Sequence, residues 1–187
     1  MEIIKEISNT DFNEFNAIVQ EYLPGTDEDE LVRKYNNNGI FTGYYLDSKI
    51  IGVCFGIGED KSNFSLSGIA IVHPYNMQGR GGHLLKYFEA VVKSKGYKNI
   101  SLGSGDGYVE RFYLKNGYKL QSLKILTEND MWKEKKDHQF PITRIETQGQ
   151  YTKLVIENIK YEDTDKRIIC DFYCGSDCFY VFEKNLI

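Results

Sequence analysis

The sequence has little proline and only a small charge imbalance. It contains 3 prolines among 187 residues, and its formal net charge is −4. With so few prolines, no Pro-rich linker divides the chain. A general nucleic-acid binder needs a basic field that displaces counterions from phosphates, and this chain has an acidic excess instead. We therefore do not expect nucleic acid as a partner.

Long apolar stretches are also missing. No run approaches the roughly 20 apolar residues that a helix needs to span a bilayer. The first residues, MEIIKEISNTDF, lack the basic start and the apolar core of a secretory signal. The expectation is a cytoplasmic protein without a membrane partner, in which the four cysteines remain free thiols.

Three of the cysteines, Cys170, Cys174 and Cys178, follow one another at intervals of four residues. Zinc sites usually show Cys-x2-Cys pairs and four ligands. The spacing here differs, and the nearest histidine, His138, lies in a charged segment. We therefore predict free thiols and no metal site, with Cys54 buried in an apolar strand.

The composition that remains is that of an ordered globular protein. Hydrophobic residues make up 41% of the chain and aromatic residues 14%. A chain of this length forms one domain, or one domain with a sizeable appendage.

Hydrophobic periodicity predicts the order β-α-α-β-β-β-α-β-α-β along the first two thirds of the chain. Thr26 with Asp29 is expected to cap the second helix, and Asp47-Ser48 to close a hairpin. An initial β-meander followed by interleaved helices and strands indicates an α/β fold with a mixed sheet. The predicted strands are 2–7, 40–46, 49–57, 64–72, 99–102 and 118–126, and the helices begin near residues 11, 26, 84 and 109.

The remaining third begins with the polar segment Thr127–Gln139, which is a linker or a surface loop. Alternating apolar residues then predict hairpin strands at 142–147 and 152–157, around Gly149. Residues 164–174 are expected to be helical, and Cys178–Leu186 to form a last, aromatic strand.

The stretch Ile69–Leu85 (IAIVHPYNMQGRGGHLL) is the most informative part of the sequence. A predicted strand leads into a loop with Gly79, Gly81 and Gly82, and the loop opens directly onto an amphipathic helix. Glycines let the backbone approach a phosphate, and a helix N-terminus presents unpaired N–H groups and a positive dipole end. Arg80 adds a positive charge. The pattern therefore indicates an anion site, with a glycine-rich turn that binds nothing as the alternative.

Two other nucleotide-binding motifs fit this loop poorly. A Walker loop ends in Gly-Lys-Ser/Thr, whereas this loop ends in Gly-Gly-His. The dinucleotide fingerprint spaces its glycines as Gly-x-Gly-x-x-Gly near a first strand. Here the spacing is Gly-x-Gly-Gly in the middle of the chain.

The loop instead resembles the acetyl-CoA pyrophosphate loop of the GNAT superfamily, whose pattern is Gln/Arg-x-x-Gly-x-Gly/Ala. Gln78 takes the first position and Gly81 the second, while His83 stands where glycine or alanine is usual. A second alignment starts at Asn76 and pairs Gly79 with Gly81. The resemblance implies that the pyrophosphate is bound by Gln78, Gly79, Arg80, Gly81, Gly82 and His83.

A second segment, Asp106–Tyr118, resembles the other GNAT signature, Asn-x-x-Ala-x-x-Phe/Leu-Tyr-x-Lys-x-Gly-Phe. Asp106 stands in the Asn position, where it implies a contact near the pantetheine arm, and Val109 stands in the Ala position. The positions that match are Phe112, Tyr113, Lys115, Gly117 and Tyr118. The two signatures occur in the family's order, and together they imply its fold over residues 2–126.

The resemblance implies an N-acetyltransferase that uses acetyl-CoA as co-substrate. The arm of acetyl-CoA is expected to pair with the backbone around Ile71 and Val72, and Tyr113 to act as general acid toward the departing thiolate. The strand 64–72 has no carboxylate for a general base. A water-relayed base or an amine that arrives deprotonated is preferred over the nearby Glu59, Asp60 and His73.

The domain expectation is a GNAT core at 1–126 and a C-terminal extension at 127–187. Residues 179–186 resemble the family's closing strand, which returns beside the strand after the second signature helix. If they are that strand, about 127–177 form an insertion. The alternative is a core that ends at Leu126.

The acceptor is expected to be a small-molecule, peptide or protein amine. Acidic residues within 22–39 suggest a cationic acceptor, but a solvated helix face is the preferred explanation for them. A homodimer is left open. A non-catalytic acyl-CoA-binding module is the alternative to the enzyme.

Overall fold

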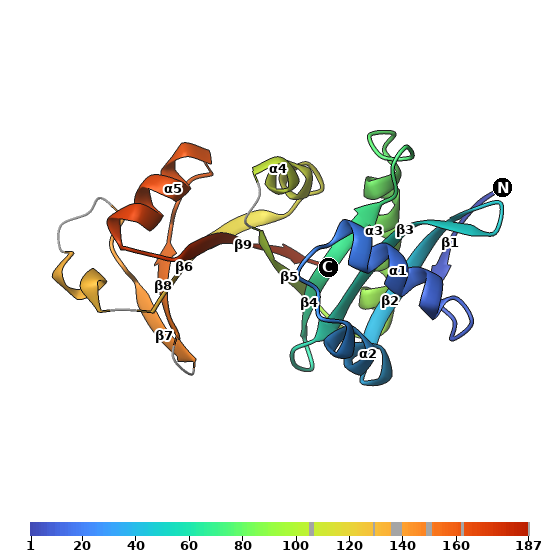
Figure 1. Cartoon of the computed structure of the whole chain (residues 1–187), viewed down its shortest axis with the longest axis horizontal. Helices are drawn as coiled ribbons and strands as arrows, with labels where there is room; N and C mark the ends of the chain where they lie inside the picture. The colour runs from blue at the N-terminus through green and yellow to red at the C-terminus, as the bar shows by residue number, and fades with distance from the viewer. Residues whose placement is uncertain (105–106, 129, 136–139, 149–150, 162, 187) are drawn as a thin grey trace. The chain divides into compact units, whose positions relative to one another are not determined.

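The structure is a computed structural model that describes residues 1–104, 107–128, 130–135, 140–148, 151–161 and 163–186. The chain divides into two compact units (Figure 1). The first unit is Met1–Ile100 together with Asn185–Ile187, and the second is Ser101–Lys184. The fold is mixed α/β with a mixed sheet, as expected.

The first unit carries a meander of neighbouring antiparallel strands in the order β1-β2-β3-β4. The predicted order of elements is confirmed, with ends that differ by a few residues. The hairpin turn at Asp47-Ser48 is confirmed as well, since both residues have positive φ angles. The elements are β1 (Glu2–Glu6), α1 (Phe12–Tyr22), α2 (Glu28–Asn36), β2 (Gly39–Leu46), β3 (Lys49–Gly58), β4 (Asn63–Ile71), α3 (Arg80–Ser94) and β5 (Asn99–Ser104), which continues into the second unit.

Helices cover both faces of this meander. Phe15 of α1 packs edge-on against Phe55 of β3, with ring centroids 5.9 Å apart. On the other face, Phe88 of α3 packs against Phe64 of β4 at 5.7 Å. Successive residues of a strand point to opposite faces, so the almost unbroken apolar runs of β2 and β3 supply two cores at once.

In the second unit, β6 lies between β9 and β8, and β7 pairs with β8. All three pairings are antiparallel. The expectation that the last strand returns beside the strand after the second signature helix is therefore confirmed. The elements are α4 (Gly107–Lys115), β6 (Lys119–Thr127), a 3-10 helix (Met131–Glu134), β7 (Arg144–Gln148), β8 (Tyr151–Glu157), α5 (Asp163–Phe172) and β9 (Asp177–Asn185).

Several smaller expectations can be compared with the structure. The segment Thr127–Gln139 contains the 3-10 helix and is not entirely irregular. The expected turn residue Gly149 lies outside the described residues. All four cysteines are free thiols, and Cys54 is buried in β3 as predicted. In the part of the chain that the structure describes, no helix is long and apolar enough to cross a membrane.

The capping residue of α2 was predicted wrongly. Asp27, rather than Thr26 with Asp29, takes the N-cap position, and its Oδ1 accepts the Glu30 N–H at 2.7 Å. The first turn contains three acidic residues after Asp27. Only the backbone conformation of the preceding loop decides which carboxylate can turn back onto the helix.

Candidate functional site

The glycine loop connects β4 to α3 in the first unit. Gly79 takes the left-handed conformation at the N-cap, with φ of 79°, and α3 begins at Arg80. Glycine has no side chain that could cap the helix, so the first amides of α3 are open to an external acceptor. Gln78, Gly79 and His83 are exposed, and Gly81 and Gly82 are half-buried. This end of α3 has the chemistry of an anion site.

Arg80 is already held by an acidic partner. Its Nη2 and Nε lie 2.8 Å and 3.2 Å from Glu2 Oε1 on β1. Nη1 also donates to the Tyr75 carbonyl at 3.3 Å and to the Gln78 side-chain oxygen. The Tyr44 hydroxyl and the Arg80 guanidinium lower the pKa of Glu2, so this carboxylate stays charged. The guanidinium therefore fixes the loop to β1 and is partly neutralised there.

At the end of β4, the backbone groups of Ile71 and Val72 point to opposite edges of the strand. The Val72 N–H donates to the Ile51 carbonyl of β3 at 2.9 Å. Backbone groups alternate sides along an antiparallel strand, so the N–H and C=O of Ile71 point to the opposite edge of β4. Of the two residues expected to pair with the arm of acetyl-CoA, Ile71 is the better placed.

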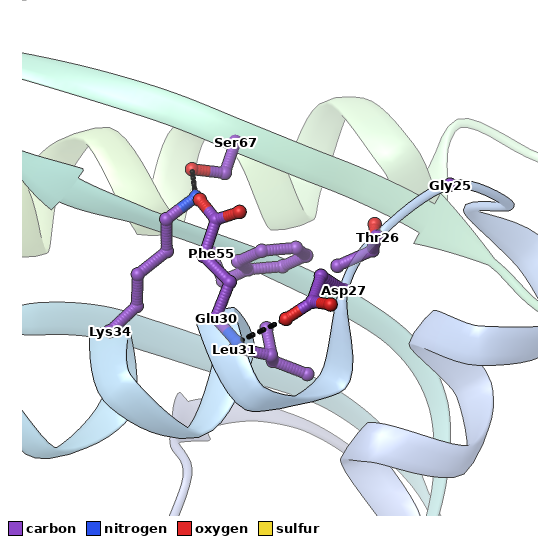
Figure 2. Close-up of a pocket in the computed structure, with 8 residues that line it drawn as sticks. All are labelled: Gly25, Thr26, Asp27, Glu30, Leu31, Lys34, Phe55 and Ser67. Carbon is purple, nitrogen blue, oxygen red and sulfur yellow. Dashed lines mark hydrogen bonds and ion pairs between the residues drawn. The ribbon is translucent and has the colours of Figure 1, made fainter.

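A β-bulge interrupts β4 at Ser67. Phe55 pairs with Gly68 and Gly56 with Leu66, which leaves Ser67 as an extra residue opposite β3. A Cβ atom at Gly68 would lie 2.8 Å from side-chain atoms of both Leu23 and Phe55, so a larger residue there would have to displace them. Bulges of this kind re-aim one side chain. Here the Ser67 hydroxyl faces a pocket (Figure 2).

The pocket lies between the α1–α2 loop, the first turns of α2, and the sheet (Figure 2). Its volume is about 180 Å³. Lys34 crosses it, and its Nζ lies 2.8 Å from Glu30 Oε1 and 3.1 Å from Ser67 Oγ. The pocket thus already binds one ammonium group. The lining residues are Gly25, Thr26, Asp27, Glu30, Leu31, Lys34, Phe55 and Ser67.

Tyr113 lies on α4 in the second unit. It is buried, with 5% of its surface exposed, and its ring contacts Tyr118 at 5.6 Å and Phe182 of β9 at 6.3 Å. The ring is therefore packed among aromatic neighbours. Asp106, expected near the pantetheine arm, lies outside the described residues.

The residues weighed as a general base have ordinary surroundings. Asp60 accepts the Ser62 N–H, the Asn63 N–H and the Asn63 side-chain amide, and the first of these contributes most to lowering its pKa. Asp60 therefore shapes the β3–β4 turn. Glu59 and His73 are exposed. The preference for a water-relayed base or a deprotonated amine stays a prediction.

The model of the Acetyltransferase (GNAT) family matches residues 2–118. Because that match covers more than half of the sequence, the chain belongs to the GNAT acetyltransferase family. No curated protein matches the sequence at a significant level.

Solved structures of similar fold include three acetyltransferases. A GNAT family acetyltransferase from Elizabethkingia anophelis with acetyl-CoA bound has a TM-score of 0.58 and 14% identity, covering 98% of this chain and 97% of the other. The ribosomal-protein-S18-alanine N-acetyltransferase from Escherichia coli has a TM-score of 0.63 and 14% identity, and the match covers 100% of this chain and 94% of the other. An aminoglycoside 6'-acetyltransferase type Ii has a TM-score of 0.60 and 18% identity, and the match covers 99% of this chain and 97% of the other. At such identities the likeness shows the fold alone.

Sequence reasoning missed the partners of the predicted residues. No local sequence pattern indicates the Arg80–Glu2 pair or the contact of Lys34 with Ser67, because 78 and 33 residues separate the partners. A glycine inside a strand, such as Gly68, is compatible with a bulge but does not say which side chain the bulge turns. The bulge is present, and it turns Ser67 toward the pocket.

Proposed function

We propose that this chain is an N-acetyltransferase that moves the acetyl group of acetyl-CoA directly onto a primary amine in a ternary complex. The observation that carries the proposal is the start of α3. There a left-handed Gly79 leaves the first helical amides open. This segment of the sequence is the one that resembles the family's pyrophosphate loop.

The residues of the first unit suit acetyl-CoA. The amides of Arg80, Gly81 and Gly82 would donate to phosphate oxygens. Gln78 in the loop and His83 in the first turn of α3 are exposed beside them. Ile71 would pair through its backbone with the amide groups of the pantetheine arm. When bound, acetyl-CoA supplies an activated acyl group and a thiolate leaving group.

Tyr113 is the proposed general acid. A phenol has an ordinary pKa near 10, so it holds its proton at neutral pH and can donate it to a developing thiolate. Its aromatic neighbours restrict the ring to a narrow range of positions. A fixed donor loses little entropy in the reaction.

The acceptor amine is proposed to enter the pocket of Figure 2. Glu30 and Ser67 already bind one ammonium there, that of Lys34. The named acceptors of two fold neighbours, an aminoglycoside and a ribosomal protein, are amines of different size. They support an amine as the acceptor class for this chain.

Isothermal calorimetry tests the cofactor first. Acetyl-CoA and CoA are expected to bind and ATP to bind weakly, and Gly82→Glu should abolish acetyl-CoA binding because its carboxylate would repel the pyrophosphate. The substitution Lys86→Glu, one turn further along the exposed side of α3, is the matched control. Failure of the wild-type chain to bind acetyl-CoA would refute the proposal.

Turnover separates the enzyme from a non-catalytic acyl-CoA-binding module. Thiol release with a library of amines is expected to identify at least one acceptor. Tyr113→Phe should then lower kcat by roughly 10²-fold or more, with the Kd for acetyl-CoA unchanged. Selective acetyl-CoA binding without turnover on any amine would favour the binding module.

A further inference from the structure

The second unit contains a buried ion pair between α4 and α5. Lys166 Nζ lies 2.7 Å from Glu110 Oε1, and the exposed fractions of the two side chains are 8% and 0%. The partners are 56 residues apart. Glu110 lies inside the family match and Lys166 lies outside it. The pair therefore connects the family's signature helix to the C-terminal segment of this chain.

Stability alone explains such a pair poorly. Removing two charges from water is costly, and well-packed apolar residues in their place often stabilise a protein at least as well. Moreover, within the described part of the chain, Glu110 Oε2 is buried without a hydrogen-bond partner. A pair with this cost contributes mainly a fixed geometry: it holds α4 at one position against α5.

Tyr113, the proposed general acid, lies one turn away from Glu110 on α4. Glu110 and Tyr113 are three residues apart on α4, so they share a helix face. A second path leads from Lys166 to Tyr113 through β9. Lys166 Nζ lies 5.2 Å from the centre of the Tyr180 ring, Tyr180 contacts Phe182 at 6.2 Å, and Phe182 contacts Tyr113 at 6.3 Å.

We infer that Glu110 and Lys166 are positioning residues, which hold the Tyr113 ring in place through α4 and through the aromatic pair of β9. The inference rests on the proposed function, because it assigns Tyr113 as the general acid. It also explains what the C-terminal segment contributes to the family core. Helix α5 supplies the lysine without which the signature helix carries a buried, unpaired carboxylate.

The test uses the double variant Glu110→Leu/Lys166→Met in the full-length chain. Removing both charges avoids the unfolding expected when a single partner stays buried. Steady-state thiol release should show kcat lowered by roughly tenfold or more, with the KM for acetyl-CoA unchanged. Arg167→Met, the exposed neighbour on α5, is the control and should leave both constants unchanged.

A second background separates positioning from a general loss of structure. In a Tyr113→Phe chain the double substitution should have no further effect on kcat, because the group that it positions is gone. An equal fall in both backgrounds, or an unchanged kcat in the wild-type background, would overturn the inference. If the double variant does not fold by circular dichroism, Lys166→Arg keeps the charge and alters the geometry. It should lower kcat with the KM unchanged, and an unchanged kcat would likewise overturn the inference.

The two proposals fail in different experiments. A wild-type chain without acetyl-CoA binding or turnover refutes the proposed function, and the positioning role with it. An active wild-type chain whose double variant retains its kcat leaves the acetyltransferase standing and removes only the positioning role.

Discussion

At the scale of single residues, a charged side chain can have a different role once its partner in the folded chain is known. Arg80 is a cation in a predicted phosphate loop, yet Glu2 lies 2.8 Å from its guanidinium. Its charge is therefore shared between the fold and any anion that binds. In the proposed site, the open amides of α3, rather than a free guanidinium, would be the main donors to a pyrophosphate.

The Arg80–Glu2 pair predicts that substitutions of its two members change the affinity for acetyl-CoA in opposite directions. Glu2→Gln should tighten acetyl-CoA binding by about two- to fivefold, because it releases the Arg80 charge. Arg80→Gln should weaken binding by a similar factor. Calorimetry at low salt measures both. Glu6→Gln, the same charge change on the same strand, is the control, and weaker binding by Glu2→Gln would contradict the expectation.

The Asp11 carboxylate makes a pH-dependent contribution to stability. Its Oδ2 accepts the Tyr45 and Ser8 hydroxyls, both at 2.8 Å, and Lys5 Nζ at 3.2 Å. These donors, Tyr45 first, lower the pKa of Asp11. Burial raises the pKa of Tyr45, so its hydroxyl remains a donor at every relevant pH. A folded pKa below the unfolded one means that the stabilisation is present at neutral pH and is lost as the pH falls through the folded value.

Asp11→Asn should therefore lower the free energy of unfolding by about 1 kcal/mol at pH 7. The difference from the wild-type chain should shrink below about pH 4. Urea unfolding at pH 7, 5 and 3 measures this, with the exposed Glu21→Gln as control. A difference that stays constant down to pH 3 would show that the carboxylate charge is not the cause.

At the scale of elements, α2 and β4 build the pocket together. The cap at Asp27 fixes where α2 begins, and the bulge at Ser67 fixes which side chain of β4 meets it. Lys34, two turns into α2, then reaches Ser67 Oγ. A helix that began one residue later would rotate Lys34 by about 100° around the axis and break this contact.

The cap can be tested against an equally acidic neighbour. Asp27→Ala should cost about 1 kcal/mol of stability and lower Tm by about 2–4 °C, because the Glu30 N–H loses its acceptor. Asp29→Ala removes the same charge from the first turn without removing a cap, and it should cost only a few tenths of a kcal/mol. Differential scanning calorimetry compares the two variants. Equal losses would assign the effect to charge alone.

At the scale of the whole molecule, the chain leaves the first unit after Ile100 and its last residues return to it. Leu186 is buried, and its N–H donates to the Lys98 carbonyl at 2.7 Å. The C-terminal end is thus part of the N-terminal unit. The stability of that unit should therefore depend on Leu186, although 86 residues separate Leu186 from Ile100 in the sequence.

Leu186→Ala should destabilise the first unit by about 2 kcal/mol through lost burial. Hydrogen exchange followed by mass spectrometry should show faster exchange in the last turn of α3 and around Lys98. Ile168→Ala, at a residue 61% exposed, is the control and should change little. Unchanged protection in the first unit would show that the closing residues do not support it.

The order of elements was predictable because it depends on local periodicity. The apolar runs within 40–57, the helical spacing in 84–92 and the turn residues Asp47-Ser48 are each patterns within a short stretch of sequence. The two signature segments were predictable for the same reason. The N-cap of α2 was not, because Asp27 and Asp29 are chemically equivalent and only the path of the backbone distinguishes them.

The amino-acid sequence by itself determined the fold class, the glycine loop and Tyr113 on the second signature helix. Only the tertiary structure decided what those residues contact: Glu2 beside Arg80, Ser67 beside Lys34, and Lys166 beside Glu110. The physical reason is distance along the chain. Strand register and helix packing bring residues 33 to 78 positions apart within hydrogen-bonding range, and no local pattern of residue types encodes such a pairing.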